Sequence, residues 1–174
     1  VERIEQFILE KNDIYQFSQY PDDEFWIVVD VDKNWSDEVI DPVGGKTYRD
    51  EWNEAISVCE EKGYGYAVSN PFFEIWLLLH HDVPNEEDKA FAVTDMHEYE
   101  KTARFRERLR ELHAPLRSDK HIELTDYDDE KIRMAVRRAE DLHVNKQDLC
   151  PRYFATTVYL LLRKIMDMLP EVRE

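Results

Sequence analysis

A strand–helix–strand pattern near the N-terminus narrows the choice of fold more than any other part of the sequence. The run Phe25-Trp26-Ile27-Val28-Val29 is aromatic and β-branched without polar alternation, which predicts a buried strand of the parallel type. A helix with a buried stripe follows over residues 48–62, Gly63 ends it, and residues 64–69 form a second strand. This order predicts a right-handed βαβ unit, whose two strands run parallel and end at the same edge of a sheet.

The remaining segments have the periodicity of helices. Residues 1–12 are amphipathic, and residues 128–143 open with three acidic residues that suit a helix N-terminus. Residues 72–81 are apolar on nearly all sides and should be buried. Residues 95–113 are so highly charged that we expect one long exposed helix there. A last helix carries an apolar stripe near the C-terminus: Phe154, Val158, Leu161, Leu162, Ile165 and Leu169.

Together these elements predict an α/β fold with a parallel sheet core and a helical C-terminal half. We expect a single domain over residues 1–174, with an α/β part at 1–93 and a helical part at 94–174, because no repeat or low-complexity tract interrupts the pattern. The chain starts at Val1, in a helix with no element before it, and we expect the natural chain to begin further upstream.

Cysteine content and hydropathy indicate the compartment. Cys59 and Cys150 are the only two cysteines, which excludes a disulfide framework and a zinc knuckle, so a reducing cytoplasm is the expected location. No apolar run exceeds five residues, whereas a membrane-spanning helix needs about 20. We therefore expect no membrane association.

The charge is strongly acidic and unevenly distributed. The net charge is −16, and residues 1–100 hold 7 basic and 25 acidic side chains, a balance of −18. General electrostatics therefore exclude a nonspecific polyanion-binding protein. Two interpretations remain: the acidity serves solubility, or some carboxylates hold a divalent cation that would bridge them to phosphate.

The first candidate site is the pair Asp30 and Asp32, directly after the first predicted strand. Ligands of open α/β sheets bind outside the carboxyl ends of the strands. Two carboxylates one residue apart can converge there on one Mg²⁺, which prefers oxygen ligands and can activate a water. The alternative is a solvated turn, because Asp is a common turn residue.

The second candidate is the string Ser69-Asn70-Pro71-Phe72-Phe73-Glu74-Ile75-Trp76-Leu77-Leu78-Leu79-His80-His81. Ser69 or Asn70 can cap the helix, with Pro71 in its first turn. Glu74 is a carboxylate among apolar residues, which requires a cation or strong donors. Its alternative role is a capping-box Glu bonded back to the cap residue. We expect the two histidines to pack or cap the helix end rather than to bind metal.

These two segments together resemble the RloB-like protein family. The resemblance rests on Phe25-Trp26-Ile27-Val28-Val29-Asp30-Val31-Asp32, on the Ser-Asn-Pro-x-Phe-Glu-x-Trp-Leu-Leu-Leu-His string, and on the late helix starting at Tyr153-Phe154-Ala155-Thr156-Thr157-Val158. It covers about residues 20–165. Members of this prokaryotic family belong with the Toprim fold and are similar to the nuclease half of the overcoming-lysogenisation-defect (OLD) family.

The resemblance implies metal-dependent cleavage of phosphodiesters. Asp30 and Asp32 match the Toprim Asp-x-Asp pair that holds Mg²⁺ or Mn²⁺, and by position Ser69 and Glu74 are second-metal or orienting residues. The Toprim Glu that works with this pair has no match here, and the family's opening strand with its Glu-Gly turn would lie upstream of Val1. Val31 also stands where the family commonly has Arg.

The resemblance also implies a biological setting. It suggests a nuclease subunit of an anti-phage, abortive-infection type defence system, with DNA or RNA as the substrate. An ABC-type ATPase partner would supply the positive surface that this acidic chain lacks. The second hypothesis is a non-catalytic interaction module that retains the Toprim scaffold.

Three other motifs give weaker alternatives. Asp30-Val31-Asp32 also resembles the nucleophile motif of haloacid-dehalogenase-like phosphatases, whose later Asp pair would be Asp128-Asp129, although those residues predict a helix start. Gly44-Gly45-Lys46-Thr47 is similar to the end of a P-loop but lacks its first glycine and a strand before it. The arginines at positions 104, 106, 108 and 110 predict a solvated helix face with ion pairs to Glu107 and Glu111.

Overall fold

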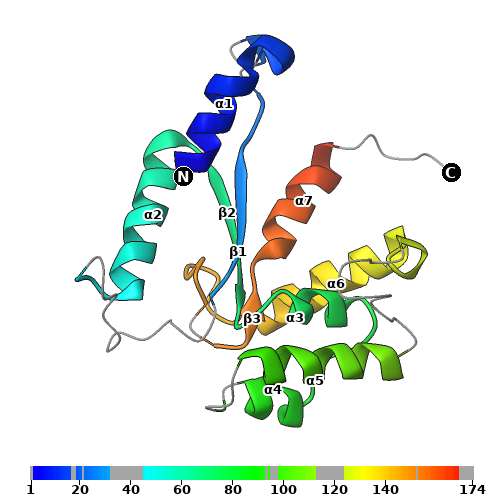
Figure 1. The fold of residues 1–174 in the computed structure, drawn as a ribbon. Helices are drawn as coiled ribbons and strands as arrows, with labels where there is room; N and C mark the ends of the chain where they lie inside the picture. The colour runs from blue at the N-terminus through cyan, green and yellow to red at the C-terminus, as the bar shows by residue number, and fades with distance from the viewer. Residues whose placement is uncertain are drawn as a thin grey trace, which may run out of the picture. The chain divides into compact units, whose positions relative to one another are not determined.

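The structure is a computed structural model that describes residues 2–16, 19–20, 22–31, 45–92, 94, 98–112, 124–151 and 153–168. Its described strands form one sheet in the order β1-β2-β3 (Figure 1), with β1 at Trp26–Asp30, β2 at Gly65–Asn70 and β3 at Ala155–Thr156. Helices make up most of the rest, and the predicted α/β fold is confirmed.

The sheet is mixed rather than wholly parallel. Gly65 N–H donates to the Phe25 carbonyl at one end of the β1–β2 pair, and Val31 N–H donates to the Ser69 carbonyl at the other. Because the partner numbers rise together, β1 and β2 are parallel and adjacent, as the sequence predicts. β3 pairs antiparallel with β2, with Ser69 opposite Thr156.

Two expectations about the sheet were wrong. β3 was not predicted, because a strand of two residues gives no periodicity in the sequence. It forms only by pairing with β2, where Thr156 lies opposite Ser69, a residue far earlier in the chain. β1 was expected to be buried, but Val28 is 46% exposed and Asp30 is exposed as well. Alternate side chains of a strand point to opposite faces, so β1 is covered on one face only.

The described chain divides into two compact units, Val1–Val28 with Asn34–Tyr66 and Val29–Lys33 with Ala67–Glu174. The first unit holds α1 (Glu2–Tyr15) and α2 (Tyr48–Lys62). Thr47 and Asp50 form a capping box at the start of α2, and Gly63 ends it with a positive φ of 70°. Within this unit, Lys62 and Glu5 form an ion pair between the two helices.

The apolar face predicted for α1 is not buried. None of the residues of α1 is buried, and Phe7 is 43% exposed, although the helix itself is confirmed and ends three residues later than expected. The stripe predicted for α2 is buried at Cys59, whereas Trp52, Ala55 and Ile56 are half-buried.

Gly65 is needed for a close approach within the first unit. A Cβ atom at this position would lie 2.3 Å from Cδ2 of the Trp26 ring, far inside van der Waals contact. We expect Gly65→Ala to lower the free energy of unfolding by about 1–3 kcal/mol, the usual cost of overpacking. Urea denaturation of the two proteins measures this difference.

The same clash provides the control for this prediction. In a Trp26→Leu background the smaller side chain leaves room for the new methyl group, so Gly65→Ala should cost clearly less there. An equal cost in both backgrounds would show that the ring contact is not the cause.

The second unit contains the remaining helices. These are α3 (Glu74–Leu79), α4 (Glu86–Ala92), α5 (Glu98–Glu111), α6 (Asp129–Leu142) and α7 (Val158–Met168), with a 3₁₀ turn at Leu124–Asp126. Helix α3 packs against both α5 and α6, and α6 packs against α7 (Figure 1). Every residue of α3 is buried, as predicted from its apolar sequence. Asp128 caps α6 by accepting a hydrogen bond from Lys131 N–H, so the predicted helix start is confirmed.

Helix α5 is not the fully exposed helix that its charge suggested. Phe105 and Leu109, four residues apart on one face, are fully buried, because even a highly charged helix can bury a narrow apolar stripe. The Phe105 ring lies 4.9 Å from the Phe72 ring and 5.9 Å from the Phe154 ring, measured between centroids. On α7 the predicted stripe is buried at Val158 but exposed at Ile165, and Leu169 lies outside the described residues.

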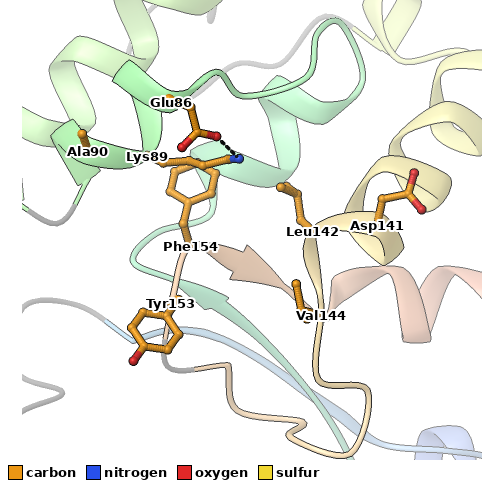
Figure 2. A pocket seen from close by; sticks show the side chains of 8 residues that line it. All are labelled: Glu86, Lys89, Ala90, Asp141, Leu142, Val144, Tyr153 and Phe154. Atoms are coloured by element: carbon orange, nitrogen blue, oxygen red, sulfur yellow. Dashed lines mark hydrogen bonds and ion pairs between the residues drawn. The ribbon is translucent and has the colours of Figure 1, made fainter.

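A hollow of about 480 Å³ opens in the second unit between α4, the end of α6 and residues 153–154 (Figure 2). Its walls include Leu142, Val144 and Phe154, and Lys89 pairs with Glu86 of the same helix α4 at 2.7 Å on one side of it. None of the candidate site residues lines it. Among the described helices, none is long and apolar enough to cross a membrane.

Candidate functional site

The candidate site lies at the carboxyl ends of β1 and β2, within the second unit. The Val31 N–H···O=C Ser69 hydrogen bond of 2.9 Å fixes the two strand ends side by side. Asp30, the last residue of β1, is exposed next to this bond. The predicted juxtaposition of Asp30 with the end of the second strand is therefore present.

The second carboxylate of the predicted pair, Asp32, lies outside the described residues. In the described part of the chain, no group of three or more His, Cys, Asp or Glu side chains is placed to hold a metal ion. A common ion between Asp30 and Asp32 stays a prediction.

Ser69 is fully buried, and its hydroxyl faces β3. Its Oγ lies 3.0 Å from Thr156 Oγ1, so the two hydroxyls share a hydrogen bond across the β2–β3 pair. Next to them, Thr157 Oγ1 accepts from Val68 N–H at 2.8 Å. The Ser69 carbonyl thus lies at the site, where it accepts from Val31 N–H, while the Ser69 side chain hydrogen-bonds to Thr156 in β3.

The predicted cap of α3 was wrong. Asn70 belongs to β2 and donates its side-chain amide to the Pro151 carbonyl at 2.7 Å, while the residue in the N-cap position is Phe73, which makes no side-chain cap. The capping-box role of Glu74 is also wrong, because the helix begins at Glu74 itself rather than two residues earlier. The strand extends further than expected because Asn70 still pairs with Ala155.

Glu74 instead forms an ion pair with the neighbouring helix α5. Its Oε1 accepts a hydrogen bond from Arg106 Nε at 3.0 Å, and its side chain is only 10% exposed. The other oxygen, Oε2, has no hydrogen-bond partner among the described residues. Oε2 is also not one of the fully buried atoms that lack a partner among the described residues, so part of its surface is accessible to solvent.

Sequence reasoning missed Arg106, because it assigned the arginines of α5 to local ion pairs. The pair of Arg108 with Glu111 is present at 3.6 Å. Other partners come from distant residues: Arg104 contacts Glu87 at 3.7 Å, and Arg108 contacts Asp82 at 2.6 Å. The usable signal was Glu74 itself, since a carboxylate inside an apolar helix demands a cation.

His80 and His81 pack at the end of α3, as predicted. His80 Nδ1 lies 2.9 Å from the Trp76 carbonyl, and the ring makes edge contacts with Trp76 and Tyr127, each at 4.9 Å between centroids. Burial lowers the pKa of His80 to about 4 and also lowers the pKa of His81. His80 is therefore neutral at physiological pH.

This burial predicts acid-sensitive stability. The pKa of His80 is 6.5 in the unfolded chain and about 4 in the folded protein, so its contribution is complete above pH 6.5. It is lost as the pH falls toward 4, because the unfolded chain binds the proton first. We expect this residue to lower the free energy of unfolding by about 3 kcal/mol between pH 7 and pH 4.

Urea denaturation at several pH values measures this effect in the wild type and in His80→Gln. The variant retains an amide that can donate to the Trp76 carbonyl and has no group that titrates. Its stability should fall less steeply over this range, and parallel profiles for the two proteins would contradict the assignment.

The donor chemistry of Asp30 and Glu74 matches a hard divalent cation. Asp30 offers an exposed carboxylate at the strand end, and Glu74 offers an oxygen that reaches solvent from a buried side chain. Both supply only oxygen, the donor that Mg²⁺ and Mn²⁺ prefer. The motif residues of the phosphatase and P-loop alternatives have structural roles. Asp128 caps α6, Lys46 forms an ion pair with Glu54, and Thr47 caps α2.

Comparison with known proteins identifies the family. A family model described as RloB-like protein matches residues 1–165, nearly the whole chain. No curated protein matches the chain, and no solved structure matches it. The chain belongs to the RloB-like family.

Proposed function

We propose that this protein is a Mg²⁺-dependent, Toprim-type nuclease subunit. The observation that carries the proposal is the parallel pairing of β1 and β2. It places Asp30 beside the carboxyl end of β2, the strand that α3 with Glu74 follows in the chain. Ligand sites of open α/β sheets lie at this edge. The resemblance of the Asp30–Asp32 and Ser69–His81 motifs to Toprim nucleases supports the same edge.

Each residue has a separate role in this proposal. Asp30 and Asp32 hold the metal ion, Glu74 contributes its solvent-facing oxygen to a second ion or to a bound water, and Ser69 fixes the strand ends through its backbone and hydroxyl bonds. When bound, the metal supplies Lewis acidity toward a phosphate oxygen and lowers the pKa of a water. In the Toprim pattern a Glu acts as the base, and no residue of this sequence matches that Glu.

The charge of the chain shapes the proposed partners. With a net charge of −16, the protein gains little from general attraction to DNA or RNA, so the metal provides the main link to the phosphates. An ABC-type ATPase subunit would supply the missing positive surface. We place the complex in the cytoplasm, as part of an abortive-infection type defence against phage.

A second candidate function is a non-catalytic interaction module with the same scaffold. It is favoured by the protein partners that Ser69 and Glu74 already have, Thr156 and Arg106. A module of this kind would bind its ATPase partner but cleave nothing.

A cleavage assay separates the two functions. The full-length protein is incubated with labelled DNA, RNA or tRNA in Mg²⁺ or Mn²⁺, with and without the ATPase partner encoded nearby. The nuclease proposal predicts metal-dependent cleavage that EDTA stops. Binding to the partner with no cleavage of any substrate under either metal would favour the module.

A further inference from the structure

The ion pair between Glu74 and Arg106 holds a nearly buried carboxylate at the start of α3. Glu74 starts a helix whose other residues are all apolar, and only 10% of its side chain is exposed. Burial of a carboxylate is costly unless a cation or strong donors compensate for lost hydration. Arg106 provides this compensation from α5, 32 residues away in the sequence.

The contact uses only one of the two carboxylate oxygens. Arg106 donates through Nε to Oε1, whereas the strongest arginine–carboxylate pairs use both oxygens in a fork. Within the described residues nothing donates to Oε2, and this atom reaches solvent although the side chain around it is nine-tenths buried. The pair therefore fixes the carboxylate and leaves one oxygen available to a ligand.

We propose that Arg106 is a positioning residue that holds Glu74 in the orientation needed to serve the metal ion or its bound water. The inference rests on the proposed metal-dependent function and adds the residue that acts through Glu74. A carboxylate with a fixed orientation binds metal more tightly than a rotating one, and loss of such an outer partner typically weakens metal binding about 10- to 100-fold.

The neighbouring pair of Arg108 with Asp82 is a matched control. It joins the same helix α5 to the segment after α3, at 2.6 Å, with a similarly covered arginine. Its acid is 39% exposed and lies at the far end of α3 from the strand ends. Arg108→Gln therefore removes an ion pair between α5 and a neighbouring segment without touching Glu74.

The test measures Mn²⁺ affinity in the full-length protein, using the EPR signal of free Mn²⁺. The proteins are the wild type, Glu74→Gln, Arg106→Gln, the double variant and Arg108→Gln, each first checked for folding by circular dichroism. We expect Arg106→Gln to weaken Mn²⁺ binding by about tenfold or more, and Arg108→Gln to leave it unchanged. The double variant should bind no more weakly than Glu74→Gln, because Arg106 acts through Glu74.

Arg106→Lys addresses the case in which Arg106→Gln does not fold. Lysine keeps a positive charge beside Glu74 but lacks the planar donor, so this variant should fold and still bind Mn²⁺ several-fold more weakly than the wild type. Wild-type affinity in Arg106→Lys, or additive losses in the double variant, would overturn the positioning role alone. Wild-type Mn²⁺ binding that Asp30→Asn leaves unchanged would overturn the proposed metal site as well.

Discussion

The Asp30→Asn variant should lose both metal-dependent stabilisation and nuclease activity. Asp30 is the exposed carboxylate at the end of β1, and an amide in its place removes the negative charge that attracts the cation. If the Kd of the wild-type protein for Mn²⁺ is about one hundredth of the Mn²⁺ concentration, binding raises the free energy of unfolding by about 2.7 kcal/mol. We expect the corresponding rise in melting temperature to disappear in the variant, and cleavage to fall by more than about a hundredfold.

Asp141→Asn is the matched control for this result. Asp141 is also an exposed carboxylate of the second unit, at the end of α6, and it lines the separate hollow rather than the strand ends. The change in charge is the same, so the variant should keep the metal response and the cleavage rate. A metal response that survives in Asp30→Asn would place the cation elsewhere.

Phe105→Ala should produce the largest loss of stability among the single substitutions considered. The ring is 1% exposed and contacts the rings of Phe72 and Phe154, so truncation to alanine leaves a cavity next to both. Loss of a buried phenylalanine costs about 3–5 kcal/mol. Urea denaturation monitored by circular dichroism measures the change.

The control for Phe105→Ala is Tyr153→Ala, which removes an aromatic ring next to Phe154 in the sequence. Tyr153 is 79% exposed, so the expected cost is within about 0.5 kcal/mol. A similarly small cost for Phe105→Ala would mean that α5 does not anchor this core.

Local signals in the sequence were enough for most helix and strand positions. Gly63 has the left-handed conformation expected of a helix stop, Asp128 caps α6, and the β-branched run before Asp30 forms a strand parallel to its neighbour. The two helix ends and the existence of the strand depend on residues that are close in the sequence, where capping and periodicity act directly. The parallel pairing follows from the order of strand, helix and strand.

The features that sequence reasoning missed depend on distant partners. β3 exists because Thr156 pairs with Ser69, and the same contact gives the Ser69 hydroxyl a partner that the sequence did not indicate. Arg106 could not be assigned to Glu74 without the packing of α5 on α3. Phe105 was hidden in a charged helix, because a narrow apolar stripe hardly changes the average composition.

We propose above that the carboxyl ends of β1 and β2 hold a catalytic metal ion. The most direct measurement is an anomalous difference map from crystals of the full-length protein grown with Mn²⁺. We expect a peak within roughly 2.2 Å of a carboxylate oxygen of Asp30, with Asp32 or Glu74 bound to the same ion or to one of its waters. A Mn²⁺ peak elsewhere, with these carboxylates bound only to protein groups, would contradict it.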